Sequence, residues 1–234
     1  MIAVAFCVIH ALSQRGARTS AVKPLNFGSR WSLPIALHIH VHLIGHHLGG
    51  LMLDPALPQN ETRRLQVLQA TGFLGPGLID DLQPYVRIAR ALCNVPIAAV
   101  SLIDRDRQWF KAMDGLDVEG TPRRFSFCAH AILQKGVFYI SDATHDERFA
   151  DNPLVLGDPG IRFYAGCPLF IEDDLGMGAL MVIDRRPRTL DADTLLRLRD
   201  LADCVQRALS HRMRLAIGSC SVSHAPAGQC GFMA

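Results

Sequence analysis

The sequence has no cluster of basic residues of the kind that binds nucleic acid. No five consecutive positions are Lys or Arg, although the chain holds 24 of them. The formal charge of +2 also belongs to the two ends, because residues 61–210 carry more acidic than basic side chains. Proteins that follow a phosphate backbone need a continuous basic surface. We therefore expect no nucleic-acid partner.

Cysteine occurs seven times, at irregular spacing and with no Cys-x-x-Cys pair. An odd count without a regular framework argues against a disulfide scaffold, and the missing pairs argue against a zinc ribbon. The apolar residues 2–12 also lack the preceding basic residue and the following small-residue cleavage site of a signal peptide. These absences favour a reducing, cytoplasmic location.

Residues 31–53 contain no Asp, Glu, Lys or Arg, and their number would suit a membrane span. The five histidines in this stretch would lie around much of a helix and leave no continuous lipid-facing surface. On a strand, His38, His40 and His42 would share one face, but no nearby carboxylate or cysteine completes a metal site. We therefore expect neither a membrane span nor a metal, and interpret residues 1–57 as a poorly structured extension.

Both ends differ in composition from the middle of the chain. From Met52 the sequence reads as an ordinary protein start, with a proline-punctuated leader before an amphipathic helix. This suggests the hypothesis that translation begins at Met52. Residues 213–234 are rich in small residues and are expected to form a disordered tail.

Residues 58–212 have the periodicities of one α+β domain. Strands at 96–104 and 108–113 form a hairpin, and Asp191 caps a final helix with apolar residues at steps of three and four. The other expected elements are helices at about 60–70, 81–93 and 128–133 (capped by Ser126), and strands at 137–140, 161–171 (bulged near 166–168) and 177–184. We predict an antiparallel sheet of five to six strands, with the N- and C-terminal helices packed on one face.

Four strings in this region resemble the GAF family, the small-molecule sensor domains of bacterial signalling proteins. They are VSLIDRDRQWFKAMDGL (100–116), RRFSFCAHAIL (123–133), DERFADNPLVLGDPGIRFYAGCPL (146–169) and GALMVIDRRPRTL (178–190). They follow in one order and are most similar to the subgroup attached to histidine kinases or diguanylate cyclases. Two departures are residues 73–78, where the family has an acidic-Thr-Pro turn, and Cys167, where it has a small residue. The resemblance implies a GAF/PAS-like fold.

The resemblance also implies a ligand pocket between one face of the sheet and the loops after the hairpin. The residues that it places there combine apolar walls with a few polar groups, as a ligand site requires. They are Trp109, Phe127, Cys128, Asp142, Arg148, Phe149, Asn152, Arg162 and Tyr164. Each also has a structural interpretation: the rings as core, Arg148 as the partner of Asp142 or Asp146, and Asn152 as part of a turn with Pro153.

Two cysteine-based alternatives would make the protein an enzyme. Cys128 and His130 could form a nucleophile and its base, but residues two apart on a helix point away from each other. Cys128 and Cys167 could approach each other across the pocket, as cysteines do in free methionine sulfoxide reductases, which are also GAF-like. The strings around these cysteines do not match that family, so we expect a non-enzymatic protein.

The function implied by the resemblance is that of a stand-alone sensor domain. It would bind a small ligand, which the sequence does not identify, and signal through its terminal helices. The partner would be a histidine kinase, a diguanylate cyclase or a second copy of the chain. The apolar stripe from Leu195 to Leu209 fits either a homodimer or packing within the domain. A dimerisation adaptor with an empty pocket is a further alternative.

Overall fold

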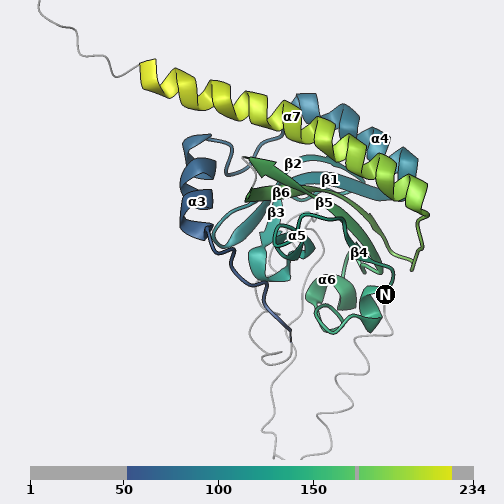
Figure 1. Ribbon diagram of the computed structural model, residues 1–234. Helices are drawn as coiled ribbons and strands as arrows, with labels where there is room; N and C mark the ends of the chain where they lie inside the picture. The colour runs from purple at the N-terminus through teal and green to yellow at the C-terminus, as the bar shows by residue number, and fades with distance from the viewer. Residues whose placement is uncertain (1–51, 172–173, 223–234) are drawn as a thin grey trace, which may run out of the picture. The chain divides into compact units, whose positions relative to one another are not determined.

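The computed structural model describes residues 52–171 and 174–222 (Figure 1). The expectations for residues 1–51 and 223–234, including the histidine-rich stretch and the choice of start codon, concern segments outside these ranges. None of the helices in the described ranges is long and apolar enough to cross a bilayer.

The centre of the domain is a six-stranded antiparallel sheet in the order β3-β2-β1-β6-β5-β4. Its two middle strands are buried at every residue, as their apolar sequences on both faces require. The strands are β1 (Ile97–Ile103), β2 (Arg107–Asp114), β3 (Gly120–Pro122), β4 (Phe138–Ile140), β5 (Phe163–Ile171) and β6 (Leu175–Asp184). The sequence predicted a sheet of five to six strands, and the sheet has six.

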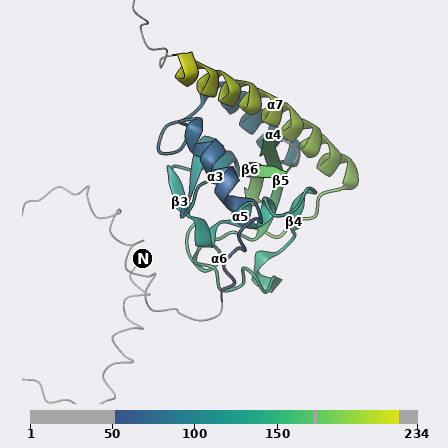
Figure 2. The same cartoon turned by 60° about the vertical axis from the view of Figure 1, so that its left-hand side comes forward.

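Helices α4 (Gln83–Cys93) and α7 (Ala192–Val222) lie side by side over one face of the sheet (Figures 1 and 2). Helix α3 (Glu61–Ala70) adds Leu68 to the same core. We call this side the helix face. The apolar stripe of α7 packs within the domain, with Leu198, Ala202, Val205, Leu209 and Met213 almost fully buried.

The opposite side, which we call the loop face, is covered by short elements and loops. They are the 3₁₀ turns η3 (Arg123–Phe125) and η4 (Ala143–His145) and the helices α5 (Phe127–Ala131) and α6 (Pro153–Leu156). Two of three predicted N-caps are confirmed, because Ser126 accepts a hydrogen bond from the Ala129 amide and Asp191 accepts one from the Thr194 amide. The third, Asn60 before α3, is wrong, because its side chain makes no capping bond and instead donates to the Asp174 carbonyl.

The structure corrects several boundaries. Helix α7 continues past residue 212 to Val222, so the disordered tail expected over 213–234 does not begin at 213. The irregularity in β5 lies between Leu169 and Phe170 rather than at 166–168. Strand β3 and helix α6 were not expected, because neither has a periodic apolar pattern and both are very short.

The turn at 73–78, where the chain departs from the GAF pattern, is bound by a buried lysine of β2. The ammonium group of Lys111 donates to the carbonyl oxygens of Gly75 (2.8 Å) and Gly77 (3.1 Å). Lys111 is also the residue skipped where the β1–β2 register shifts between Val100 and Ser101. This bulge decides which face the preceding residues of β2 occupy.

Candidate functional site

Four aromatic rings form a buried cluster on the loop face: Phe127, Phe138, Phe149 and Tyr164. We call them the aromatic cluster. Phe127 of α5 stacks on Phe149 with a centroid distance of 3.9 Å and an interplanar angle of 10°. Tyr164 of β5 lies 5.1 Å from Phe127, and Phe138 of β4 contacts Phe149 and Tyr164 edge-on. The described side chains thus fill the space where the pocket was expected.

A thiol and a hydroxyl lie inside this cluster. The Tyr164 hydroxyl donates to the Cys128 Sγ at 3.1 Å, and the same sulfur lies 3.3 Å from the Met181 Sδ. Burial raises the pKa of the Cys128 thiol, although the hydrogen bond from the Tyr164 hydroxyl opposes the shift. A neutral thiol is a poor nucleophile, so the position of Cys128 fits a buried polar contact better than covalent catalysis.

Cys128 and His130 have different neighbours. Whereas Cys128 contacts Tyr164 and Met181, the His130 ring packs 4.8 Å from Phe149 and 6.2 Å from Phe138. Burial is the main reason that the pKa of His130 is lowered to about 4, and the nearby Arg148 adds to the effect. His130 therefore contributes a neutral ring to the edge of the aromatic cluster.

Arg148 covers the outer side of the cluster. Its guanidinium lies 4.8 Å from the centre of the Phe138 ring and 5.5 Å from that of Phe149. Of its two expected partners it pairs with Asp146, through contacts of 2.9 Å and 2.6 Å. The Arg148 side chain remains 40% exposed, so it is a cation at the boundary between the cluster and solvent.

Asn152 and Arg162 bind the backbone of the covering loop. The Asn152 amide donates to the Phe125 carbonyl at 3.1 Å and accepts from the Leu154 amide at 2.9 Å, which caps α6. Arg162 donates to the carbonyl oxygens of Val155 and Ile161. Both side chains therefore shape the loop.

The remaining two predicted residues make other contacts. Asp142 caps η4, accepts from Thr144, and lines a shallow surface depression of about 430 Å³. Trp109 pairs with Leu102 across the β1–β2 ladder and so shares the helix face with it. The structure does not bring Trp109 to the aromatic cluster.

Sequence reasoning missed three members of the site: His130 as a packing ring, Phe138 and Met181. The pairing of Phe138 with Gly166 and of Ile140 with Tyr164 places β4 beside the cluster, and this register was the missing signal. Gly166 has a specific role, because a Cβ atom there would lie 2.2 Å from the Tyr164 hydroxyl oxygen. Only glycine leaves room for this ring.

The cysteine pair of the reductase alternative is wrong. Cys167 belongs to the core on the helix face, with Phe163 and Ala165 at alternate positions of β5, whereas Tyr164 and Cys128 lie on the loop face. The sheet therefore separates the two thiols. Within the described ranges no group of three His, Cys, Asp or Glu side chains is suited to hold a metal ion.

Comparison with known proteins places these features in a family. The model of the GAF domain matches residues 77–209. A cyclic di-GMP phosphodiesterase of Pseudomonas aeruginosa is 48% identical over 137 residues, which are 58% of this chain and 23% of that protein. This chain therefore spans less than a quarter of that relative's length.

Solved structures with a similar fold share little sequence identity with this chain. One is the GAF domain of an Acinetobacter phosphoenolpyruvate-protein phosphotransferase (17% identity, 68% of this chain and 96% of that one, TM-score 0.46). Another is the free methionine-R-sulfoxide reductase of Neisseria meningitidis (16% identity, 70% and 98%, TM-score 0.48).

Proposed function

Because the chain belongs to the GAF family, we propose that it is a non-enzymatic, cytoplasmic sensor domain that binds a small ligand at the aromatic cluster. The observation that carries this proposal is the buried stack of Phe127, Phe149 and Tyr164 around a hydroxyl–thiol contact. A ligand site needs apolar walls and a few convergent polar groups, and this cluster has both.

Ligand entry requires the covering loop to move, because the described side chains fill the cluster. The loop is bound by contacts that can open individually: the Arg148–Asp146 ion pair, the Asn152 amide and Arg162. A ligand that binds the open form better would shift the population toward it. A compound with a flat apolar part and an anionic group fits the rings and Arg148.

The output would pass through the terminal helices. The inner stripe of α7 is occupied by its own domain, so a homodimer would use the outer side of α4 and α7. Ile88, Leu196 and Leu215 are exposed there, at 53%, 60% and 61%. The name of the Pseudomonas relative supports a place in cyclic di-GMP signalling. As the partner we propose a histidine kinase or a diguanylate cyclase, the proteins to which the most similar GAF subgroup is attached.

Native mass spectrometry of the protein purified from its own host tests the proposal. We expect a small-molecule adduct that is lost in Arg148→Ala and retained in Arg197→Ala, a matched change in an exposed ion pair of α7. An adduct that persists in both variants places the ligand elsewhere. A protein with no adduct and no thermal stabilisation by candidate ligands is a dimerisation adaptor. Turnover of methionine sulfoxide that is lost in Cys128→Ser would show an enzyme.

A further inference from the structure

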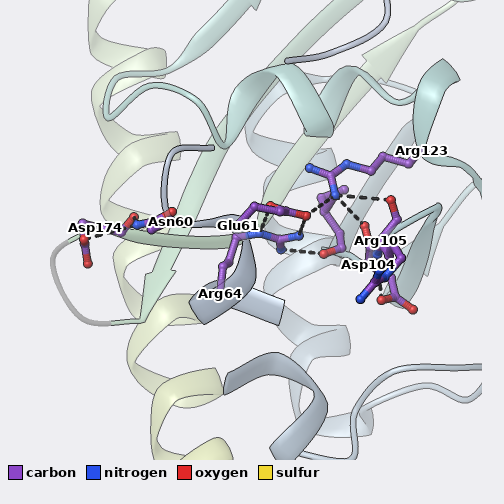
Figure 3. Close-up of polar contacts among 8 residues, drawn as sticks. Asn60, Glu61, Arg64, Asp104, Arg105, Arg123 and Asp174 are labelled. Atoms are coloured by element: carbon purple, nitrogen blue, oxygen red, sulfur yellow. Dashed lines mark hydrogen bonds and ion pairs between the residues drawn. The ribbon is translucent and has the colours of Figure 1, made fainter. Parts of the chain in front are cut away.

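A buried cluster of three charged residues joins α3 to the loop face (Figure 3). The Glu61 carboxylate, in the first turn of α3, accepts from the Arg64 Nε at 2.7 Å and the Arg64 Nη2 at 2.9 Å. It also accepts from the Arg123 Nη1 at 2.5 Å. The Arg64 side chain is fully buried and that of Arg123 is 5% exposed. Charges at such depth are held only where their partners are fixed.

The same two arginines bind the end of strand β1. Arg64 donates to the Ile103 carbonyl at 2.6 Å, and Arg123 donates to the Asp104 carbonyl at 2.9 Å. Burial alone would raise the pKa of Glu61, but the hydrogen bonds and charges of both arginines outweigh it and lower the pKa to about 2. One ionised carboxylate thus connects α3, the β1–β2 hairpin and η3.

Only some of the hydrogen-bond donors of Arg123 have partners. Its Nε and Nη2 atoms are buried and have no hydrogen-bond partner among the described residues. Two cations share one carboxylate, so the cluster carries a net positive charge. Because buried donors without partners are costly, a shift that exposes Arg123 to water would recover part of this cost. The contact between Arg123 and Glu61 is therefore the one most easily released.

Arg123 is also directly connected to the aromatic cluster. It begins η3, which runs through Phe125 and the Ser126 cap into α5, where Phe127 and Cys128 lie. The Phe125 carbonyl accepts from Asn152 in the covering loop. A loop or a helix α5 that moves at the cluster must therefore move the backbone that carries Arg123.

We propose that Glu61, Arg64 and Arg123 form a latch that couples the position of α5 at the aromatic cluster to the docking of α3. With the cluster closed, Arg123 holds Glu61 and α3 stays bound to the hairpin. When α5 shifts, Arg123 withdraws, and α3 loses one of the ties at this end, where the bonds from Arg64 to the Ile103 carbonyl and from Asn60 to Asp174 remain. This inference rests on the proposed function for its purpose, since the latch would report ligand binding to the N-terminal side of the domain.

Amide hydrogen exchange of the full chain, measured without ligand, tests the latch. Asn152→Asp is the perturbation, because the carboxylate keeps the acceptor that caps α6 but cannot donate to the Phe125 carbonyl. We expect exchange to rise at least about threefold in residues 123–131 and also in residues 64–70 of α3. Arg197→Ala is the control and should change neither segment.

The decisive comparison repeats Asn152→Asp in a Glu61→Gln background. In this background Asn152→Asp should still increase amide exchange in residues 123–131, but it should no longer increase amide exchange in residues 64–70. An Asn152→Asp effect confined to residues 123–131 of the otherwise unchanged protein overturns the latch, as does an equal increase in α3 in both backgrounds. Arg123→Lys keeps the positive charge but loses the planar guanidinium group. As a background it must, like Glu61→Gln, abolish the effect of Asn152→Asp on exchange in residues 64–70. Because no ligand is added, the latch and ligand binding can fail independently.

Discussion

The two faces of the sheet each cover a core cluster, and the two clusters differ in chemistry. The helix face is mostly aliphatic and is closed by two regular helices, and its thiols Cys93 and Cys167 have pKa values raised by burial to about 11 and about 12. The loop face is aromatic, is closed by short irregular elements, and binds its thiol Cys128 to a tyrosine hydroxyl. An aliphatic layer under helices fixes the fold, whereas rings and polar contacts under loops can rearrange around a ligand.

The largest effect is expected where the helix face loses volume. Leu198 of α7 is fully buried, so Leu198→Ala should lower the free energy of unfolding by about 3 kcal/mol, through lost burial and a cavity. Leu196→Ala, two residues earlier and 60% exposed, should change it by less than about 0.5 kcal/mol. Urea unfolding measures both variants. Equal effects would show that α7 is not the fixed layer described above.

The loop face should be sensitive to added volume. Gly166→Ala brings a Cβ atom to 2.2 Å from the Tyr164 hydroxyl oxygen, so the ring must move, at a cost of about 2 kcal/mol. Gly136→Ala is the control, since a Cβ atom there meets nothing within 4 Å. Urea unfolding gives the cost, and near-ultraviolet circular dichroism reports the displaced tyrosine. An unchanged spectrum in Gly166→Ala would contradict the close packing of the aromatic cluster.

The helix face was the more predictable of the two. Strands β1 and β6 are apolar on both sides, and the 3-4 spacing of α7 names its buried residues directly, so pattern alone locates this core. Trp109 shows where pattern fails. Without the bulge at Lys111 it would lie opposite Ile103 on the loop face, and the shift of one residue moves it to the helix face.

The loop face is built from contacts between residues far apart in the sequence, and no local sequence pattern predicts such contacts. The resemblance to the GAF family correctly brought Phe127, Cys128, Phe149 and Tyr164 together. It could not show that Cys167 lies behind the sheet, because alternation along β5 decides this. It also gave no sign of the contact between Glu61 and Arg123, which are 62 positions apart in sequence.

The loop face, unlike the helix face, should make the stability of the protein depend moderately on pH, through His130. The pKa of His130 is about 4 in the folded protein and 6.5 when unperturbed, so between these values the unfolded chain binds a proton that the folded chain does not. Stability is therefore complete above pH 6.5 and falls as the pH is lowered toward 4. Because the ring is partly exposed, we expect a loss of about 1 kcal/mol between pH 7 and pH 5.

His130→Gln should remove this part of the pH dependence, and His211→Gln, at an exposed position of α7, serves as the control. Chemical unfolding at pH 7, 6 and 5 measures it. The window ends above pH 4.5, the unperturbed pKa of Glu61; below it, down to the folded-state pKa of about 2, Glu61 would add its own loss of stability. A profile of His130→Gln parallel to that of the unmodified protein would mean that the His130 ring is charged or solvated in the fold.

The smallest effect concerns the hydroxyl–thiol contact itself. Tyr164→Phe removes a neutral donor from a weak sulfur acceptor, so the expected loss of stability is about 0.5 to 1 kcal/mol. In a Cys128→Ala background the same substitution should cost clearly less, because its partner is already absent. In a Cys167→Ala background, with the thiol of the helix face removed, it should cost as much as before. Equal costs in all three backgrounds would mean that Tyr164 is held by its ring alone, and that the loop face, like the helix face, is a packed core.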